Sequence, residues 1–277
     1  MCSRTRYGTE LPSLNEHDFN IISHLMADIS GIQMAAHKRA LVSGRLMKRL
    51  RILQLDSFSD YVALLNNPQQ QEERRIAVDL LTTNETFFFR EKPHFDLLLK
   101  LLKQHPRRPL RLWSAACSSG EEVYSLAMTL NEGLEQGTHW EIIGSDLCRQ
   151  ALDKAKQAIY PLQRTENLPT EWLNRYCLKG VGDMDGLFRV RQELRQHTRF
   201  ECLNLNIPLP PTLGCFDIIF LRNMLIYFDP KTKQQILERI IAQLKPGGLL
   251  FVGHSEGLHG INLPVTAYAP AVYRKTE

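Results

Sequence analysis

The sequence contains no apolar run that approaches the ~18 residues needed for a transmembrane helix. Its first residues, MCSRTRYG, lack the apolar core of a secretory signal peptide. Six cysteines are scattered along the chain, without a CxxC pair and without histidines at zinc-ligand spacing. We therefore expect a cytoplasmic protein with reduced thiols, no disulfide framework and no bound metal.

An excess of one charge is also missing. The net charge at pH 7 is +4, which is too small to indicate nucleic-acid binding by itself. The 277 residues, 43% of them hydrophobic, suffice for one α/β core and an accessory unit. The distribution of charge along the chain is therefore more informative than its sum.

The stretch Leu110–Leu130 has the pattern of a strand, a turn of small residues and a helix. Small residues let the backbone approach a ligand closely, as in nucleotide-binding turns, although the GxGxxG spacing of dinucleotide folds is absent. Glu121 and Glu122 follow the turn, where they would repel a pyrophosphate. They suit a cofactor with positive charge, such as S-adenosylmethionine, and the alternative is that they only cap the helix.

Polar residues also follow two further predicted strands. Trp140–Gly144 leads to Asp146, which is placed to bind ribose hydroxyls or, alternatively, to serve as the N-cap of the next helix. Phe216–Phe220 reads as a strand buried on both faces and leads to Arg222 and Asn223. These residues should lie at the carboxyl edge of the sheet, where open α/β folds bind ligands.

Two other segments complete the predicted sheet domain. Tyr160–His197 departs from the α/β rhythm and predicts a small antiparallel insertion, with Leu187–Arg191 as a half-exposed strand. Near the C-terminus, Asp229-Pro230 predicts the start of a helix that runs to Leu244. That helix should stop at Pro246-Gly247-Gly248, before a strand over Leu249–Gly253.

The N-terminal region predicts a small helical unit, with helices over Leu14–Gly31, Ala36–Leu53, Phe58–Leu65 and Glu72–Leu81. The second of these is strongly polarised, with basic residues opposite its apolar arc: Lys38, Arg45, Lys48 and Arg49. No acid lies between Ala36 and Leu55. Such a face suits an acidic partner (a nucleic acid, an anionic membrane or a glutamate-rich helix), or it is a plain solvated surface.

The segment Thr82–Arg90, TTNETFFFR, interrupts the helical pattern before Glu91–Gln104 resumes it. Three adjacent phenylalanines, Phe87–Phe89, cannot all face one core. At least one of them should therefore pack on a neighbouring domain or a ligand.

Four motifs occur in order: TTNETFFFRE, WSAACSSGEEVYSLAM, SDLCRQALDKA and FLRNMLIYFD. Together they resemble the chemotaxis receptor methyltransferases, the CheR family, and the resemblance covers nearly the whole chain. It implies a Rossmann-like α/β sheet of an S-adenosylmethionine-dependent methyltransferase, with an N-terminal helical domain and a small inserted antiparallel β-subdomain. The implied divisions are a receptor-docking domain at 1–81, a linker and helix at 82–109 that complete the cofactor site, and a cofactor-binding domain at 110–277. The insertion falls at about 160–197 within the last of these.

The resemblance implies methyl transfer from S-adenosylmethionine to glutamate side chains of receptor signalling helices, which tunes receptor adaptation and releases S-adenosylhomocysteine. The implied partners are the cytoplasmic signalling helices of methyl-accepting receptors. Some family members also bind a receptor C-terminal peptide at the β-subdomain, and Gly180-Val181-Gly182 resembles their loop. No nucleic acid, no membrane insertion and a monomeric chain are expected.

The resemblance also carries site residues over, position by position. The implied cofactor contacts are Asn84, Thr86, Arg90, Glu121, Glu122, Asp146, Asn204, Leu205, Arg222 and Asn223. The implied catalytic residues are Arg90 and Tyr227, and the implied receptor-docking residues are Lys38, Arg45, Lys48 and Arg49. Which of Glu121 and Glu122 contacts the cofactor stays open, and no metal ligand is implied.

A glutamate acceptor is already ionised at neutral pH, since its ordinary pKa is about 4.3, so no general base is required. Arg90 then clamps a carboxylate or forms a structural ion pair, and Tyr227 contacts the acceptor or packs in the core. Cys117 has no histidine in its motif to activate it and is expected to be a packing residue. The alternatives are a methyltransferase with another substrate and a cofactor-binding sensor or scaffold without transfer activity.

Overall fold

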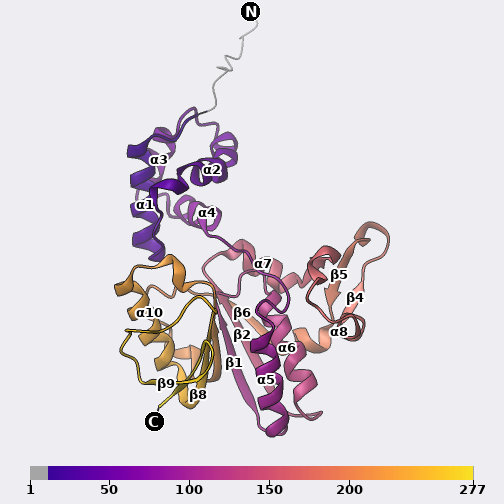
Figure 1. Cartoon of the computed structure of the whole chain (residues 1–277). Helices are drawn as coiled ribbons and strands as arrows, with labels where there is room; N and C mark the ends of the chain where they lie inside the picture. The colour runs from indigo at the N-terminus through magenta and orange to yellow at the C-terminus, as the bar shows by residue number, and fades with distance from the viewer. Residues whose placement is uncertain (1–11, 277) are drawn as a thin grey trace, which may run out of the picture. The chain divides into compact units, whose positions relative to one another are not determined.

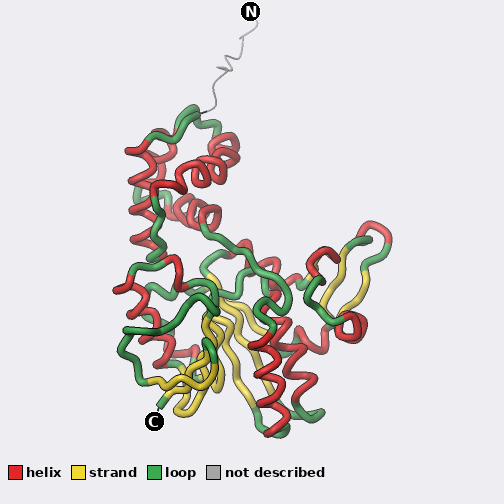
Figure 2. The backbone as a smooth tube through the Cα atoms, in the orientation of Figure 1, coloured by secondary structure: helices red, strands yellow, loops and turns green. Residues whose placement is uncertain are grey.

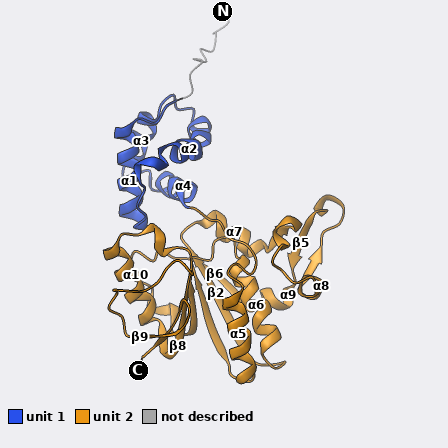
Figure 3. Cartoon of the chain, viewed as in Figure 1, with its two compact units in different colours: residues 1–82 blue, residues 83–277 orange. Residues whose placement is uncertain are grey.

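The computed structural model describes residues 12–276 and divides the chain into two compact units, residues 1–82 and 83–277 (Figure 3). No helix in the described range is long and apolar enough to cross a membrane.

The first unit is helical. Its helices are α1 (Glu16–Ser30), α2 (Arg39–Leu53), α3 (Phe58–Asn66) and α4 (Gln71–Leu81). All four predicted helices are therefore present, but a short 3-10 turn over Ala36–Lys38 precedes the α-helix in the second one. Asn15 caps α1 at its start, and Gly31 adopts a left-handed conformation at its end. The core of this unit is apolar, with residues such as Ile22, Met26 and Leu46 fully buried.

The second unit is built on a seven-stranded sheet of order β6-β2-β1-β7-β8-β10-β9 (Figures 1 and 2). Its strands are β1 (Leu110–Ala115), β2 (Trp140–Asp146), β6 (Thr198–Cys202), β7 (Phe216–Leu221), β8 (Leu244–Val252), β9 (Val265–Ala269) and β10 (Val272–Lys275). The first five in spatial order are parallel, and β10 and β9 are antiparallel additions. The central strand β1 ends at the small-residue turn, which places that turn in the middle of the carboxyl edge.

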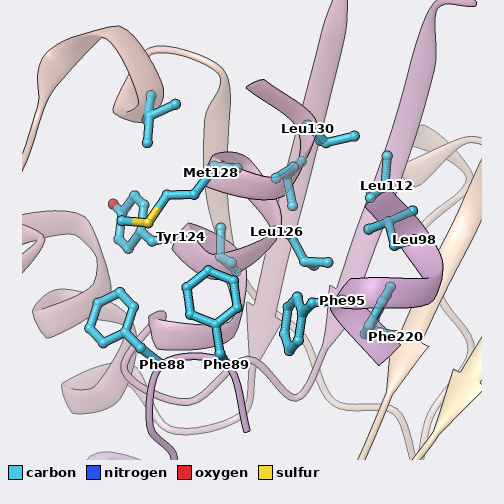
Figure 4. Close-up of a cluster of buried hydrophobic side chains, with 14 of the residues drawn as sticks. Phe88, Phe89, Phe95, Leu98, Leu112, Tyr124, Leu126, Met128, Leu130 and Phe220 are labelled. Atoms are coloured by element: carbon cyan, nitrogen blue, oxygen red, sulfur yellow. The ribbon is translucent and has the colours of Figure 1, made fainter. Parts of the chain in front are cut away.

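Helices cover both faces of this sheet: α5 (Pro93–Gln104), α6 (Glu121–Gly133), α7 (Arg149–Gln157) and α10 (Pro230–Ala242). Successive strand residues point to opposite faces, so Leu112 joins one core cluster and Trp113 joins the other. The first cluster packs α5 and α6 against the sheet and includes Phe88, Phe89 and Phe220 (Figure 4).

The predicted antiparallel insertion is confirmed. Between α7 and β6 lies a three-stranded sheet of order β3-β5-β4, formed by Ile159–Pro161, Leu187–Val190 and Cys177–Lys179. This insertion also contains the helix α8 (Thr170–Tyr176), and the short helix α9 (Gln192–Arg195) leads back to the main sheet. We call residues 159–190 the inserted subdomain.

The prediction for the C-terminal helix and strand is partly wrong. Asp229 caps α10 as expected, but the helix ends at Ala242, and β8 already begins at Leu244. Strand β8 pairs Leu244 with Phe216 and Leu249 with Ile218, which leaves residues 245–248 as a bulge. The Pro-Gly-Gly sequence therefore bends a strand here instead of separating a helix from one.

Candidate functional site

The turn after β1 has an unusual backbone. Ala116, Ser118 and Gly120 all have positive φ, at 68°, 51° and 91°. Glycine is required at the last position, since a Cβ there would lie 2.7 Å from the Cβ of Ala155 and 3.1 Å from the hydroxyl of Tyr160. The turn therefore packs tightly against α7 and the inserted subdomain.

The two glutamates at the start of α6 lie in different surroundings. Glu121 is fully buried, and its carboxylate accepts hydrogen bonds from Arg164 Nη1 at 2.6 Å and Ser119 Oγ at 2.7 Å. Glu122 accepts a hydrogen bond from Ser114 Oγ at 2.7 Å, and its other oxygen lies 3.4 Å from Arg222 Nε. Burial, opposed in part by Arg222, raises the pKa of Glu122 above its ordinary value. Glu121 is therefore neutralised within the chain, whereas the charge of Glu122 is only partly compensated.

Asp146 at the end of β2 ties the turn to the second strand. Its carboxylate accepts the N–H of Ser118 at 2.8 Å and the N–H of Cys148 at 2.9 Å. The alternative that Asp146 is the helix N-cap is wrong, because Cys148 occupies that position. The carbonyl of Asp146 accepts the N–H of Leu203 at 3.0 Å, which brings the end of β6 beside it.

Asn204 and Leu205 follow at that strand end. Asn204 Oδ1 accepts the N–H of Asn206 at 2.9 Å, and Leu205 is buried. Cys117 is buried in the same turn, and burial raises the pKa of its thiol, as expected of a packing residue.

The segment from Thr83 to Arg90 lies across the turn. The carbonyl of Asn84 accepts a hydrogen bond from Ser118 Oγ at 2.8 Å, and that of Thr86 accepts one from Arg164 at 3.0 Å. The carbonyl of Arg90 accepts a hydrogen bond from Arg222. Residues that precede the sheet in sequence thus fold back over its carboxyl edge.

The three adjacent phenylalanines do not all enter the core, and one of them packs on the inserted subdomain. Phe88 packs on Tyr160 and Phe188 of the inserted subdomain, and Phe89 is buried in the same core cluster. Phe87 is 37% exposed, and the guanidinium of Arg90 lies 5.6 Å from the centre of its ring. The side chain of Arg90 also donates to the carbonyl of Glu85 at 3.0 Å.

Arg222 is buried at the end of β7, and two of its nitrogens, Nε and Nη1, find no hydrogen-bond partner among the described residues. Its neighbour Asn223 donates from Nδ2 to Glu91 at 2.9 Å and from its backbone to Glu256 at 2.6 Å. Neither glutamate was expected at the site from the sequence. Glu91 directly follows the linker motif and Glu256 closely follows a predicted strand, and those positions are the signals that could have identified them.

Glu256 organises the loops at this edge. It is almost fully buried and also accepts the N–H groups of Gly253 at 3.0 Å and Ile226 at 3.3 Å. Tyr227 follows Ile226 in a short 3-10 turn, so the carboxylate holds the segment that carries this tyrosine.

Glu91, His94 and His254 form a further cluster, with possible ligand atoms within 4.8 Å of one another. Burial and the nearby Arg222 lower the pKa of His94 to about 4. Arg222 Nη2 lies 3.7 Å from Glu91 and opposes a second cation there. The absence of a metal stays a prediction.

Two of the four expected docking residues are engaged within the helical unit. Arg45 donates to the carbonyls of Leu81 and Thr82, and Arg49 forms an ion pair with the buried Glu73. Burial alone would raise the pKa of Glu73, but hydrogen bonds from Arg49 and Tyr61 outweigh it and hold the pKa below its ordinary value. These contacts fix the side chains of Arg45 and Arg49 within the helical unit.

The exposed basic face of α2 is smaller than the sequence suggested. Lys48 is exposed as expected, and Lys38 is half-buried. Arg39 and Arg51, which were not singled out from the sequence, are exposed on the same helix.

A mainly parallel seven-stranded sheet, a small-residue turn after β1 and a pair of acids at the start of α6 define a Rossmann-like methyltransferase that uses S-adenosylmethionine. Two family models match the chain: "CheR methyltransferase, all-alpha domain" over residues 17–82 and "CheR methyltransferase, SAM binding domain" over residues 84–269. The chain therefore belongs to the CheR family of chemotaxis methyltransferases. The family, fold class and cofactor predicted from the sequence are confirmed.

Curated relatives match over nearly their whole length. The chain is 43% identical to the chemotaxis protein methyltransferase of Escherichia coli, over 96% of this chain and 93% of that protein. It is 40% identical to the chemotaxis protein methyltransferase of Salmonella typhimurium, over 96% and 92% of the two chains. Identity to chemotaxis protein methyltransferase 2 of Pseudomonas aeruginosa is 41%, over 96% and 97%.

Proposed function

We propose that this methyltransferase transfers a methyl group from S-adenosylmethionine to glutamate side chains on the cytoplasmic signalling helices of chemotaxis receptors. The products are γ-glutamyl methyl esters and S-adenosylhomocysteine, and the consequence is a change in receptor adaptation. Family membership and the 40–43% identity to relatives named chemotaxis protein methyltransferase support this substrate class.

The observation that carries the proposal is the pair of incompletely compensated charges at the carboxyl edge of the sheet. The methionine end of the cofactor carries an ammonium and a carboxylate. Glu122, whose pKa is raised by burial, offers a partner for the ammonium. Arg222 Nη1, which makes no hydrogen bond or ion pair with the described residues, offers a donor for the carboxylate. A zwitterionic ligand would therefore supply a partner for the charge of Glu122 and for that of Arg222. For this reason we assign the cofactor contact to Glu122 in preference to Glu121.

The other half of the cofactor fits the strand ends beyond the turn. We propose that Asp146 binds the ribose hydroxyls, since each carboxylate oxygen can accept more than one hydrogen bond. Asn204 and Leu205 would flank the adenine, and the linker residues Asn84 and Thr86 would close over the cofactor. Asn223, held by Glu91 and Glu256, would complete the wall beside Arg222.

When bound, the cofactor supplies an electrophilic methyl group on a sulfonium. The chain has no proton to remove, because the acceptor glutamate is ionised at neutral pH. Its task is to align the acceptor oxygen with the methyl group and to exclude water around two charges that cancel in the product. Alignment of this kind can lower a barrier by several kcal/mol.

We propose that Arg90 and Tyr227 perform this alignment. Arg90 lies on the linker beside the exposed ring of Phe87, and its charge suits the incoming carboxylate. Tyr227 lies on the loop that Glu256 holds, where its hydroxyl can direct the acceptor oxygen. Arg90→Ala should therefore lower kcat more than it weakens cofactor binding, and equal losses of both would limit Arg90 to cofactor capture.

We propose that Lys48 and Arg51, which are exposed one turn apart on α2, dock on the acidic methylation region of the receptor. A second contact is proposed at the inserted subdomain. Strand β4 lies at the edge of its sheet; its residue Leu178 is 49% exposed, and Val181, which follows the strand, is 81% exposed. A receptor C-terminal peptide could pair with this edge as an added strand.

One assay tests the function and its alternatives. Radiolabelled S-adenosylmethionine is mixed with the protein and receptor cytoplasmic fragments, and the labelled product is then treated with alkali. Release of labelled methanol is expected, because carboxyl methyl esters are base-labile. Alkali-stable label would indicate another acceptor, and cofactor binding without transfer would indicate a sensor or scaffold.

A further inference from the structure

Arg164 belongs to the inserted subdomain, yet it reaches the edge of the cofactor site. It lies in the 3-10 turn Leu162–Thr165, directly after β3. A single nitrogen, Nη1, donates to the carboxylate of Glu121 at 2.6 Å and to the carbonyl of Thr86 at 3.0 Å. One guanidinium thus joins three segments: the subdomain, the first residue of α6 and the linker.

The ion pair is strongly asymmetric in its exposure. The side chain of Glu121 is 1% exposed, whereas that of Arg164 is 45% exposed. The buried carboxylate depends on this cation, because a buried charge without a partner is strongly destabilising. A substitution of the exposed Arg164 should therefore disturb the buried Glu121 at the turn.

Two further hydrogen bonds connect the same part of the chain: one joins the inserted subdomain to the turn, and the other joins the turn to the linker. Tyr160, also in the inserted subdomain, donates its hydroxyl hydrogen to the carbonyl of Ser119 at 2.8 Å. Ser118 donates to the carbonyl of Asn84 at 2.8 Å. The linker is therefore held to the turn at Asn84 and to the subdomain at Thr86, on either side of Glu85.

We propose that Arg164 is a positioning residue for cofactor binding: it holds Glu121 and the carbonyl of Thr86 together and so keeps the linker closed over the cofactor. The inference rests on the proposed function, since it takes Asn84, Thr86 and Glu122 as cofactor contacts. Arg164 itself does not touch the cofactor. Its loss should weaken cofactor binding while leaving kcat at saturating cofactor nearly unchanged.

The test compares full-length variants by calorimetric binding of S-adenosylhomocysteine and by receptor methylation kinetics. Arg164→Met keeps the aliphatic stem and removes both hydrogen bonds. It should weaken binding and raise the KM for S-adenosylmethionine about tenfold, as expected for loss of one charged hydrogen bond. Arg164→Lys should restore binding to within about threefold, since one ammonium carries enough N–H groups for both contacts.

The matched control is Arg175→Met. Arg175 also joins the inserted subdomain to α6, through Glu132, but at the far end of the helix. This variant should bind S-adenosylhomocysteine like the unmodified protein. If Arg164→Met and Arg175→Met bind equally well, or if Arg164→Lys binds as weakly as Arg164→Met, the proposal is wrong.

A double variant separates positioning from folding. Glu121→Gln combined with Arg164→Met leaves no unpaired buried charge, so its Tm should exceed that of Arg164→Met. Its affinity should stay reduced because Thr86 still lacks its donor, and full recovery of affinity would overturn the positioning role. Failure of the unmodified protein to bind S-adenosylhomocysteine would instead contradict the proposed function.

Discussion

Glu122→Gln should separate cofactor binding from stability. The amide can still accept the hydrogen bond from Ser114, so local packing is preserved. Burial raises the pKa of Glu122, which means that its charge is disfavoured in the folded chain. The free energy of unfolding at neutral pH should therefore stay unchanged or increase in the variant.

Cofactor binding should change in the opposite direction. A hydrogen bond between charged groups contributes about 1.5 to 3 kcal/mol, which corresponds to about 10-fold to 150-fold in Kd. The variant should raise the Kd for S-adenosylhomocysteine by this factor, as measured by calorimetric titration. A larger loss for S-adenosylmethionine would place the carboxylate near the sulfonium, and an equal loss would place it at the ammonium, which both ligands carry.

The pH dependence gives an independent check. Only the ionised carboxylate attracts the ammonium, so affinity should fall as pH decreases through the pKa of Glu122. Because that pKa is raised, the fall should begin at a higher pH than for an ordinary glutamate. Glu122→Gln should show no such acid limb, and Glu132→Gln, at the far end of α6, is the matched control. A variant that binds within threefold of the unmodified protein, with the same acid limb, would refute the reasoning.

Three further outcomes are expected. Lys48→Glu should lower receptor methylation about tenfold at low salt without changing cofactor affinity. Arg49→Glu should instead unfold the first unit, because Arg49 forms an ion pair with Glu73. If both variants fold and slow methylation equally, the distinction between an exposed docking residue and a structural residue is wrong. Gly120→Ala should destabilise the second unit by about 2 to 5 kcal/mol in urea titration, since the backbone is left-handed and Ala155 lies in the way. Glu73→Gln should lower the free energy of unfolding of the first unit by about 3 kcal/mol at neutral pH. In the unmodified protein the stabilisation by Glu73 is complete above its unfolded pKa and is lost as pH falls through its lowered folded pKa. Unfolding followed by circular dichroism should therefore depend less on acid pH in the variant.

Much of the fold could be predicted because strong local patterns coincide with the elements. The apolar run of Phe216–Phe220 determines a strand, and the Asp-Pro pair determines the start of α10. Both effects depend on residues close together in the chain, so they can be predicted from the sequence. The start of β8 was missed because its pairing with β7 across a bulge is a long-range property. Strand β9 was missed for a similar reason, since it is half-exposed and paired only with β10.

The candidate site shows the same division. The expected acids, Glu121 and Glu122, are present at the helix start, but their different surroundings come from Arg164 and Arg222, which are distant in sequence. The roles of Arg45 and Arg49 within the helical unit could not be read from a helical wheel, which does not show the partners of a side chain. Spacing identifies which side chains share a face, and only the folded contacts show which of them are already paired.

The inserted subdomain begins and ends on neighbouring strands. Ile159 pairs with Arg189, and the N–H of Val190 donates to the carbonyl of Ala158 at 3.0 Å. A segment whose two ends meet can be lengthened, shortened or exchanged at a small cost in loop entropy, because the main sheet receives the chain at the same point. The parts of the subdomain beyond Tyr160 and Arg164 can therefore change in length while these two residues keep their contacts to the turn and the linker.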